Sequence, residues 1–248
     1  MSGHSKWAQI KRKKGALDKK RGALFSRLVK EITVAAREGG GNPDANIRLR
    51  AAIDRAKAAS MPADNIERAI KRGTGQLPGV SYEEITYEGY APGGVAVIVE
   101  SLTDSRNRTT AAVRHIFSKR GGNLGENGCV SWLFDRRGVI RIAEGKYPEE
   151  FLLEKVMEAG GEDLVIEDGE VRVLTSPEDL HKVCAGLEEA GIAVTESELT
   201  LVPKNLVRPS LEEAKAAMTL LEALEEDEDV QAVHSNLDPP EELLSELE

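Results

Sequence analysis

The sequence predicts an α+β multidomain chain in which a small N-terminal helical domain is followed by two α/β sandwich domains, one ferredoxin-like and inserted in the other. The first 75 residues place apolar side chains at helical spacing between breaks rich in glycine and proline. Beyond a glycine-rich linker at residues 73–79, short β-branched runs alternate with helical segments. A chain of 248 residues is long enough for two or three cores of modest size. We therefore expect domains at residues 1–79, at 80–135 plus 199–248, and at 136–198.

Three helices are predicted in the N-terminal domain. The first spans residues 22–38 and ends at three consecutive glycines. Asn42 and Pro43 are residue types preferred at an N-cap and in a first turn, so the second helix is expected from there to about residue 59. The third helix, residues 60–73, has basic residues in its last turn. Because all three helices are short, the core of this domain is expected to be thin.

The discontinuous sandwich domain is predicted from two separate segments. The first segment contains strands at 82–90 and 95–101, a helix from Asp104 or Ser105 to Arg120, and a strand at 129–134. The second segment contains a strand at 199–207, a helix at 211–225 and a strand at 230–236. Residues from Asp238 onward are rich in glutamate and are expected to form a short acidic tail.

The inserted domain is predicted from a second regular run of elements. In order these are a strand at 139–143, a helix at 148–159, strands at 164–167 and 171–174, a helix at 176–190 and a strand at 193–195. The order β-α-β-β-α-β is typical of the ferredoxin-like fold, and about 60 residues are enough for one such unit.

The net charge of −10 hides a separation of charge along the chain. Residues 1–75 contain 18 basic and 7 acidic residues, whereas residues 76–248 contain 15 basic and 36 acidic residues. This separation is typical of a protein that binds a polyanion with one part and keeps the other part away from it. The sequence has no apolar run long enough to span a bilayer and no recognisable secretory signal. Two isolated cysteines fit a reducing compartment, so a cytoplasmic location is expected.

The residues from Met1 to Arg21 form a basic arm that contains a single acid, Asp18. Clustered ammonium and guanidinium groups cannot be buried without carboxylates beside them, so the arm is expected to contact phosphates while Trp7 stacks on a base or sugar. The alternative is a disordered tail that only aids solubility. A second contact is predicted beside the helix after Ser105, where solvated surface charge is the alternative. The predicted nucleic-acid-binding residues are His4, Lys6, Trp7, Lys11, Arg12, Lys13, Lys14, Lys19, Lys20, Arg21, Arg106 and Arg108.

No arrangement of residues in the sequence indicates catalysis. The four histidines are scattered over different predicted elements, and two lone cysteines cannot hold a metal ion. Glycine-rich residues 121–125 follow a helix and precede a strand, the reverse of the order in a phosphate-binding loop. The acidic residues between 222 and 229 are expected to form a solvated helix end rather than a two-metal site. We therefore expect a protein that is not an enzyme, with no cofactor, metal ion, small-molecule substrate or membrane partner.

The N-terminal sequence GHSKWAQIKRKKGALDKKRGALFSRLVKEI resembles the opening of proteins of the YebC/PmpR family. Further similarity lies at residues 42–44, 61–66, 87–94, 103–109 and 121–124, so the resemblance covers essentially the whole chain. The family includes proteins described as DNA-binding transcriptional regulators, the mitochondrial translational activator of cytochrome c oxidase, and relatives implicated in ribosome function at stalling-prone sequences. The resemblance implies a three-domain cytoplasmic protein without catalytic activity.

Two functions follow from the arm and the resemblance together. The first is a nucleic-acid-binding regulator of gene expression that controls transcription through DNA, as the family's usual description implies. The second is a ribosome-associated translation factor that binds ribosomal RNA and tRNA and relieves stalling. A basic arm with an aromatic residue, in a sequence without a helix-turn-helix signature or a dimerisation heptad, favours irregular folded RNA. The expected partner is DNA or ribosomal RNA, with the ribosome as a further partner in the second case.

Overall fold

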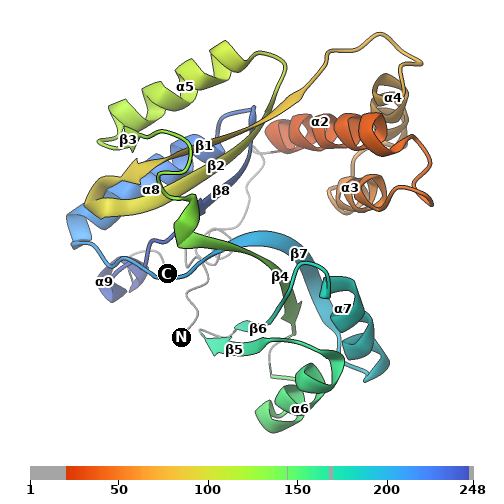
Figure 1. Ribbon diagram of the computed structural model, residues 1–248, viewed down its shortest axis with the longest axis vertical. Coiled ribbons are helices and arrows are strands. Elements are labelled where there is room, and N and C mark those ends of the chain that lie inside the picture. The colour runs from red at the N-terminus through yellow and green to blue at the C-terminus, as the bar shows by residue number, and fades with distance from the viewer. Residues whose placement is uncertain (1–20, 144, 168–169, 246–248) are drawn as a thin grey trace. The chain divides into compact units, whose positions relative to one another are not determined.

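The structure is a computed structural model that describes residues 21–143, 145–167 and 170–245 (Figure 1). It contains a helical N-terminal region and two four-stranded antiparallel sheets, which confirms the predicted α+β class. The described residues fall into two compact units, one made of residues 132–206 and the other of residues 21–131 with 207–245. Among the described helices, none has the length and apolar character needed to cross a membrane.

The helical region consists of α2 (Arg21–Gly39), α3 (Ile47–Ala58) and α4 (Ala63–Gly73). Apolar residues at helical spacing bring Ile32, Leu49 and Ala69 into one core, where each is fully buried. The three helices were predicted, but the second starts four residues later than expected. Its N-cap is Asn46, whose Oδ1 accepts the N–H of Leu49 at 3.0 Å. Asn42 was expected to be the cap, but its side chain accepts the N–H of Asp44 in a turn before the helix.

The first sheet has the strand order β3-β1-β2-β8. Its strands are β1 (Glu83–Ala91), β2 (Val95–Thr103), β3 (Asn123–Leu124) and β8 (Val230–Ser235). Helices α5 (Arg106–Lys119) and α8 (Leu211–Glu225) pack with it, and Phe117 and Leu220 join Val97 and Val99 in one core. The strand β8, which lies after residue 207, therefore completes a sheet begun before residue 131.

Residues 129–133 do not form the predicted strand. Glu88 on β1 is 6% exposed, and its carboxylate accepts the backbone N–H groups of Gly128, Val130 and Ser131, each at 2.8 Å. Burial alone would raise the pKa of Glu88, but these three hydrogen bonds lower it below its usual value. Because the N–H groups are used in this way, the segment is a loop with a 3₁₀ turn at Ser131–Leu133. On the edge of β1 opposite β2, the pairing strand is β3.

The C-terminal residues also differ from expectation. Residues after Asp238 were expected to be an acidic tail, but they form the short helix α9 (Glu241–Ser245). Leu243 on this helix is 4% exposed and packs into the core under α8. Burial of Leu243 therefore anchors this segment against the domain.

The inserted unit has the ferredoxin-like arrangement that the order of elements predicts. Its elements are β4 (Phe134–Ile142), α6 (Glu149–Ala159), β5 (Asp163–Glu167), β6 (Glu170–Thr175), α7 (Leu180–Glu189) and β7 (Val194–Pro203), and its strand order is β5-β6-β4-β7. Residues 199–203, predicted in a strand of the other domain, belong to β7. The strand β6 pairs only with residues 138–142 of β4. Residues 134–137 of β4 therefore pair with residues 200–203, which extend β7.

Candidate functional site

Helix α5 differs in charge from the acidic part of the chain in which it lies. Its sequence, RNRTTAAVRHIFSK, has four cations and no acid, whereas residues 76–248 have more than twice as many acids as bases. Val113 and Phe117 are fully buried against the first sheet, so the charged side chains are left on the solvent side. The helix therefore presents a positive face on an otherwise negative part of the chain.

The cations of this face differ in how they are paired. Arg106 is 65% exposed, and its Nε lies 3.9 Å from Glu83 Oε2, which is a long contact between two exposed groups. Arg114 and Lys119 are exposed and make no ion pair with any other residue that the structure describes. These three side chains are available to an external anion, and we define them as the α5 face.

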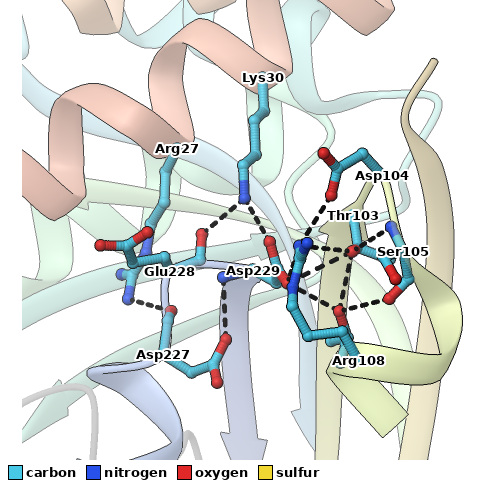
Figure 2. A network of polar contacts seen from close by, with 10 residues as sticks. Arg27, Lys30, Thr103, Asp104, Ser105, Arg108, Asp227, Glu228 and Asp229 are labelled. Carbon is cyan, nitrogen blue, oxygen red and sulfur yellow. Dashed lines mark hydrogen bonds and ion pairs between the residues drawn. The ribbon is translucent and has the colours of Figure 1, made fainter. Parts of the chain in front are cut away.

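Arg108 has different surroundings, because it is part of a polar network centred on Asp229 (Figure 2). Its Nη2 lies 2.8 Å from Asp229 Oδ2 and 2.7 Å from Asp104 Oδ1. The Thr109 hydroxyl donates to the same Asp229 oxygen at 2.7 Å. The hydrogen bonds to Asp229 and Asp104 raise the pKa of Arg108 above its ordinary value, so it stays charged.

Helix α2 supplies the other side of this network. Lys30 Nζ lies 2.5 Å from Asp229 Oδ1 and donates to the Glu228 carbonyl at 2.9 Å. Arg27 donates to the carbonyls of Glu225 and Asp227, the second at 3.2 Å. Figure 2 shows the side chains of Arg27 and Lys30 extending from α2 toward the turn between α8 and β8. The carbonyls at the end of α8 carry partial negative charge, so cations are favoured there.

Asp229 is held as an ion although its side chain is only 9% exposed. Burial by itself would raise the pKa of Asp229, but the hydrogen bonds from Lys30, Arg108 and Thr109 lower it to about 2. The backbone is fixed as well, because its carbonyl accepts the Leu102 N–H at 2.8 Å and its N–H donates to Asp227 Oδ1 at 2.9 Å. The network therefore ties α2, α5 and the edge of the first sheet to one carboxylate.

This network predicts a specific loss of stability in acid. The pKa of Asp229 is lower in the folded protein than the 3.8 of a free side chain, so its contribution is present above about pH 4 and is lost as the pH falls through about 2. The lowering of the pKa from 3.8 to about 2 corresponds to about 2 kcal/mol of stability. We expect urea unfolding to show Asp229→Asn less stable than wild type by this amount at neutral pH, with the difference shrinking below about pH 4. A difference that stays constant down to about pH 2 would contradict the assignment.

A cavity of about 530 Å³ lies beside the network. Its lining includes the cations Lys30 and Arg108 and the carboxylates Asp104, Asp227, Glu228 and Asp229. Carboxylates outnumber cations there, so the cavity does not suit a phosphate. Among the described residues, no group of three histidine, cysteine or acidic side chains is placed to hold a metal ion.

The structure locates only part of the predicted site. Ten of its twelve residues lie in the arm; residues 1–20 are outside the described part, and Arg21 is the first residue of α2. Arg106 and Arg108 lie at the start of α5. Sequence reasoning did not find Lys30 or Asp229. Asp229 was assigned to a solvated acidic run, but it is buried, and the only local signal was its place directly before the β-branched start of strand β8 at Val230.

Comparison with known proteins identifies the family. A family model described as the TACO1/YebC second and third domain matches residues 82–237, and one described as the TACO1/YebC protein N-terminal domain matches residues 5–76. The chain belongs to the TACO1/YebC family. Probable transcriptional regulatory proteins of Desulfotalea psychrophila and Chlorobaculum tepidum are each 55% identical to it, with 100% of this chain and 99% of theirs covered.

A solved structure of a TACO1/YebC-like chain supports the fold. The crystal structure of a conserved hypothetical protein from Aquifex aeolicus matches with a TM-score of 0.81 and 51% sequence identity. The match covers 92% of this chain and 94% of the other. The similarity therefore extends over most of the chain and agrees with membership of the TACO1/YebC family.

Proposed function

We propose that this chain is a non-enzymatic, nucleic-acid-binding regulator of gene expression. The arm and the α5 face, together with Arg108, bind the phosphate backbone, and the site requires no cofactor. The proposal rests mainly on the segregation of charge, in which the N-terminal region and α5 carry a net positive charge while the rest of the chain carries an excess of acids. A basic surface beside an acidic one attracts a polyanion in one orientation and repels it in others. The names of the TACO1/YebC relatives support a role in gene regulation.

A second function is ribosome-associated control of translation. The arginines of α3 favour it, because each is already paired with a carboxylate: Arg48 with Glu38 at 2.6 Å, Arg50 with Asp44 at 3.0 Å, and Arg55 with Glu31. A helix whose guanidinium groups are engaged in this way offers little to base edges in a DNA major groove. Contact with phosphates alone suits a folded RNA recognised by shape, which fits binding to ribosomal RNA.

Fractionation and crosslinking distinguish the two functions. Cell extract is separated on a sucrose gradient, and the nucleic acid crosslinked to the protein is sequenced. Promoter DNA without ribosomal reads is the result expected for transcriptional control through DNA. Co-sedimentation with ribosomes and reads in ribosomal RNA would replace that function by the translational one. Crosslinks to neither nucleic acid would overturn the proposal as a whole.

A further inference from the structure

Helix α6 of the inserted unit leaves two large apolar side chains in water. Leu152 and Val156 are buried in the core of this unit, whereas Leu153 and Met157 are 51% and 64% exposed. Each exposed residue follows a buried one, so it lies about 100° round the helix from the core side. Leu153 and Met157 are four residues apart and are therefore neighbours on one side of α6.

The edge strand β5 adds a third exposed apolar side chain. In the sheet order β5-β6-β4-β7, α6 contacts β5, while α7 contacts β4 and β7 (Figure 1). Ala159 packs against Gly186 on α7, so the two exposed side chains lie on the side of α6 away from α7, toward the outer edge of β5. Ile166 on β5 is 42% exposed and lies opposite the core residue Val171, which places it on the face that α6 covers. We define the α6–β5 patch as Leu153, Met157 and Ile166.

Acidic side chains surround this patch. Helix α6 carries four glutamates and one lysine, and Nζ of that lysine, Lys155, already lies 3.0 Å from Glu154 and 2.7 Å from Glu158. Glu150 and Asp163 are exposed as well. An exposed apolar patch with a charged rim is typical of a protein–protein contact. The negative rim repels phosphates, anionic lipid headgroups and the same patch on a second copy, so it suits a partner of the opposite charge.

We infer that the α6–β5 patch is a docking surface for a basic protein segment, whose apolar side chains cover Leu153 and Met157 while its lysines or arginines face the glutamates of α6. The patch belongs to the inserted unit and contains none of the cations proposed to bind nucleic acid, so this inference does not depend on the proposed function. The flexible, polarisable side chain of Met157 can adapt to an apolar side chain of the partner.

A synthetic amphipathic peptide of leucine and lysine is the probe for this surface. The full chain carries isotope labels in its methionine methyl groups, and NMR follows their signals as the peptide is added. Met157 is 64% exposed, whereas Met61 and Met218 are 6% and 5% exposed, so Met157 reports on the patch. We expect the peptide to shift the Met157 signal and to leave those of Met61 and Met218 in place. Failure of the peptide to bind, or binding that leaves the Met157 signal unchanged, would overturn the inference.

Leu153→Ser tests the apolar part of the surface. Its control is Leu199→Ser, because Leu199 is 46% exposed on β7, at the opposite edge of the same sheet. Both side chains are exposed, so neither replacement removes core packing. In fluorescence anisotropy with the labelled peptide, we expect Leu153→Ser to bind at least about tenfold more weakly than Leu199→Ser. Equal affinities of the two variants would contradict the docking surface.

Glu154→Gln with Glu158→Gln tests the acidic rim. Its control, Glu188→Gln with Glu189→Gln, removes the same charge from exposed positions on α7. We expect the α6 variant to bind the peptide about threefold more weakly than the α7 variant at low salt, with the difference shrinking as salt is added. Equal binding of a peptide whose leucines are replaced by serine would show attraction by charge alone and would overturn the inference. Self-association of the protein that Leu153→Ser abolishes, measured by sedimentation velocity, would assign the patch to a second copy and would overturn it as well.

Discussion

Replacing Lys11, Arg12, Lys13 and Lys14 together by glutamate is expected to abolish nucleic-acid binding while leaving the thermal unfolding of the α/β domains unchanged. If the arm engages about 6 to 8 phosphates of duplex DNA, log K falls with log salt at a slope near −5 to −7. Loss of four contacts makes this slope shallower by about 3.6, and at about 0.1 M salt it lowers the affinity by more than about 10³-fold. Fluorescence anisotropy across a salt series measures both quantities.

The matched control reverses charges outside the proposed surface. Lys146→Glu with Lys182→Glu changes two exposed lysines of the inserted unit and should alter the affinity and the salt slope only slightly. Retained affinity of the arm variant at low salt would place the binding surface elsewhere, and the cations between Arg106 and Arg120 would be the next to test. A shift in its thermal unfolding would show that the arm also stabilises the fold.

Replacing Glu88 by Gln should destabilise the first sheet domain strongly. Both carboxylate oxygens accept backbone N–H groups: one accepts that of Gly128 and the other accepts those of Val130 and Ser131. A glutamine can offer only one oxygen, so its NH₂ group must face at least one backbone N–H, donor against donor. The loss of charge-assisted hydrogen bonds and the unsatisfied donor cost about 2 to 4 kcal/mol of the free energy of unfolding, measurable by urea denaturation.

Glu126→Gln is the control for this prediction. Glu126 lies in the same loop and is exposed, so its replacement removes an equal charge and should change the free energy of unfolding by less than about 0.5 kcal/mol. If Glu88→Gln is no less stable than Glu126→Gln, the three hydrogen bonds contribute little, and the loop must be held by its other contacts, such as the Tyr90 hydroxyl that donates to the Cys129 carbonyl.

Elements with complete local signals could be predicted from the sequence. Helix α8 was expected at residues 211–225 and spans these residues. Its N-terminus is a capping box, in which Ser210 accepts the Glu213 N–H and Glu213 accepts the Ser210 N–H. The ferredoxin-like topology could be predicted as well, because the order of its elements leaves few ways to form a sheet.

Features that depend on distant residues could not be predicted. Nothing near Asn46 in the sequence distinguishes it from Asn42, but its side chain also donates to the Ala35 and Gly40 carbonyls, which lie in the preceding helix and loop. Lys30 and Asp229 are separated by 199 residues, and each is one charge among many. A single sequence does not reveal which acid becomes buried, because that depends on the packing of α2 and α5 around the turn before β8.

The insertion of residues 132–206 determines the order in which a nascent chain can fold. During synthesis β2 emerges early, but its neighbour β8 and the covering helix α8 follow only after the whole inserted unit. Until then one edge of β2 is not paired with β8, and Val97 and Val99 are not covered by α8. An unpaired strand edge beside exposed apolar side chains favours pairing with the wrong strand or aggregation. The inserted unit, whose strands are all consecutive in the chain, can fold before that. Asp229 lies directly before β8, so the contacts that tie α2 and α5 to its carboxylate form only after the whole inserted unit has been synthesised.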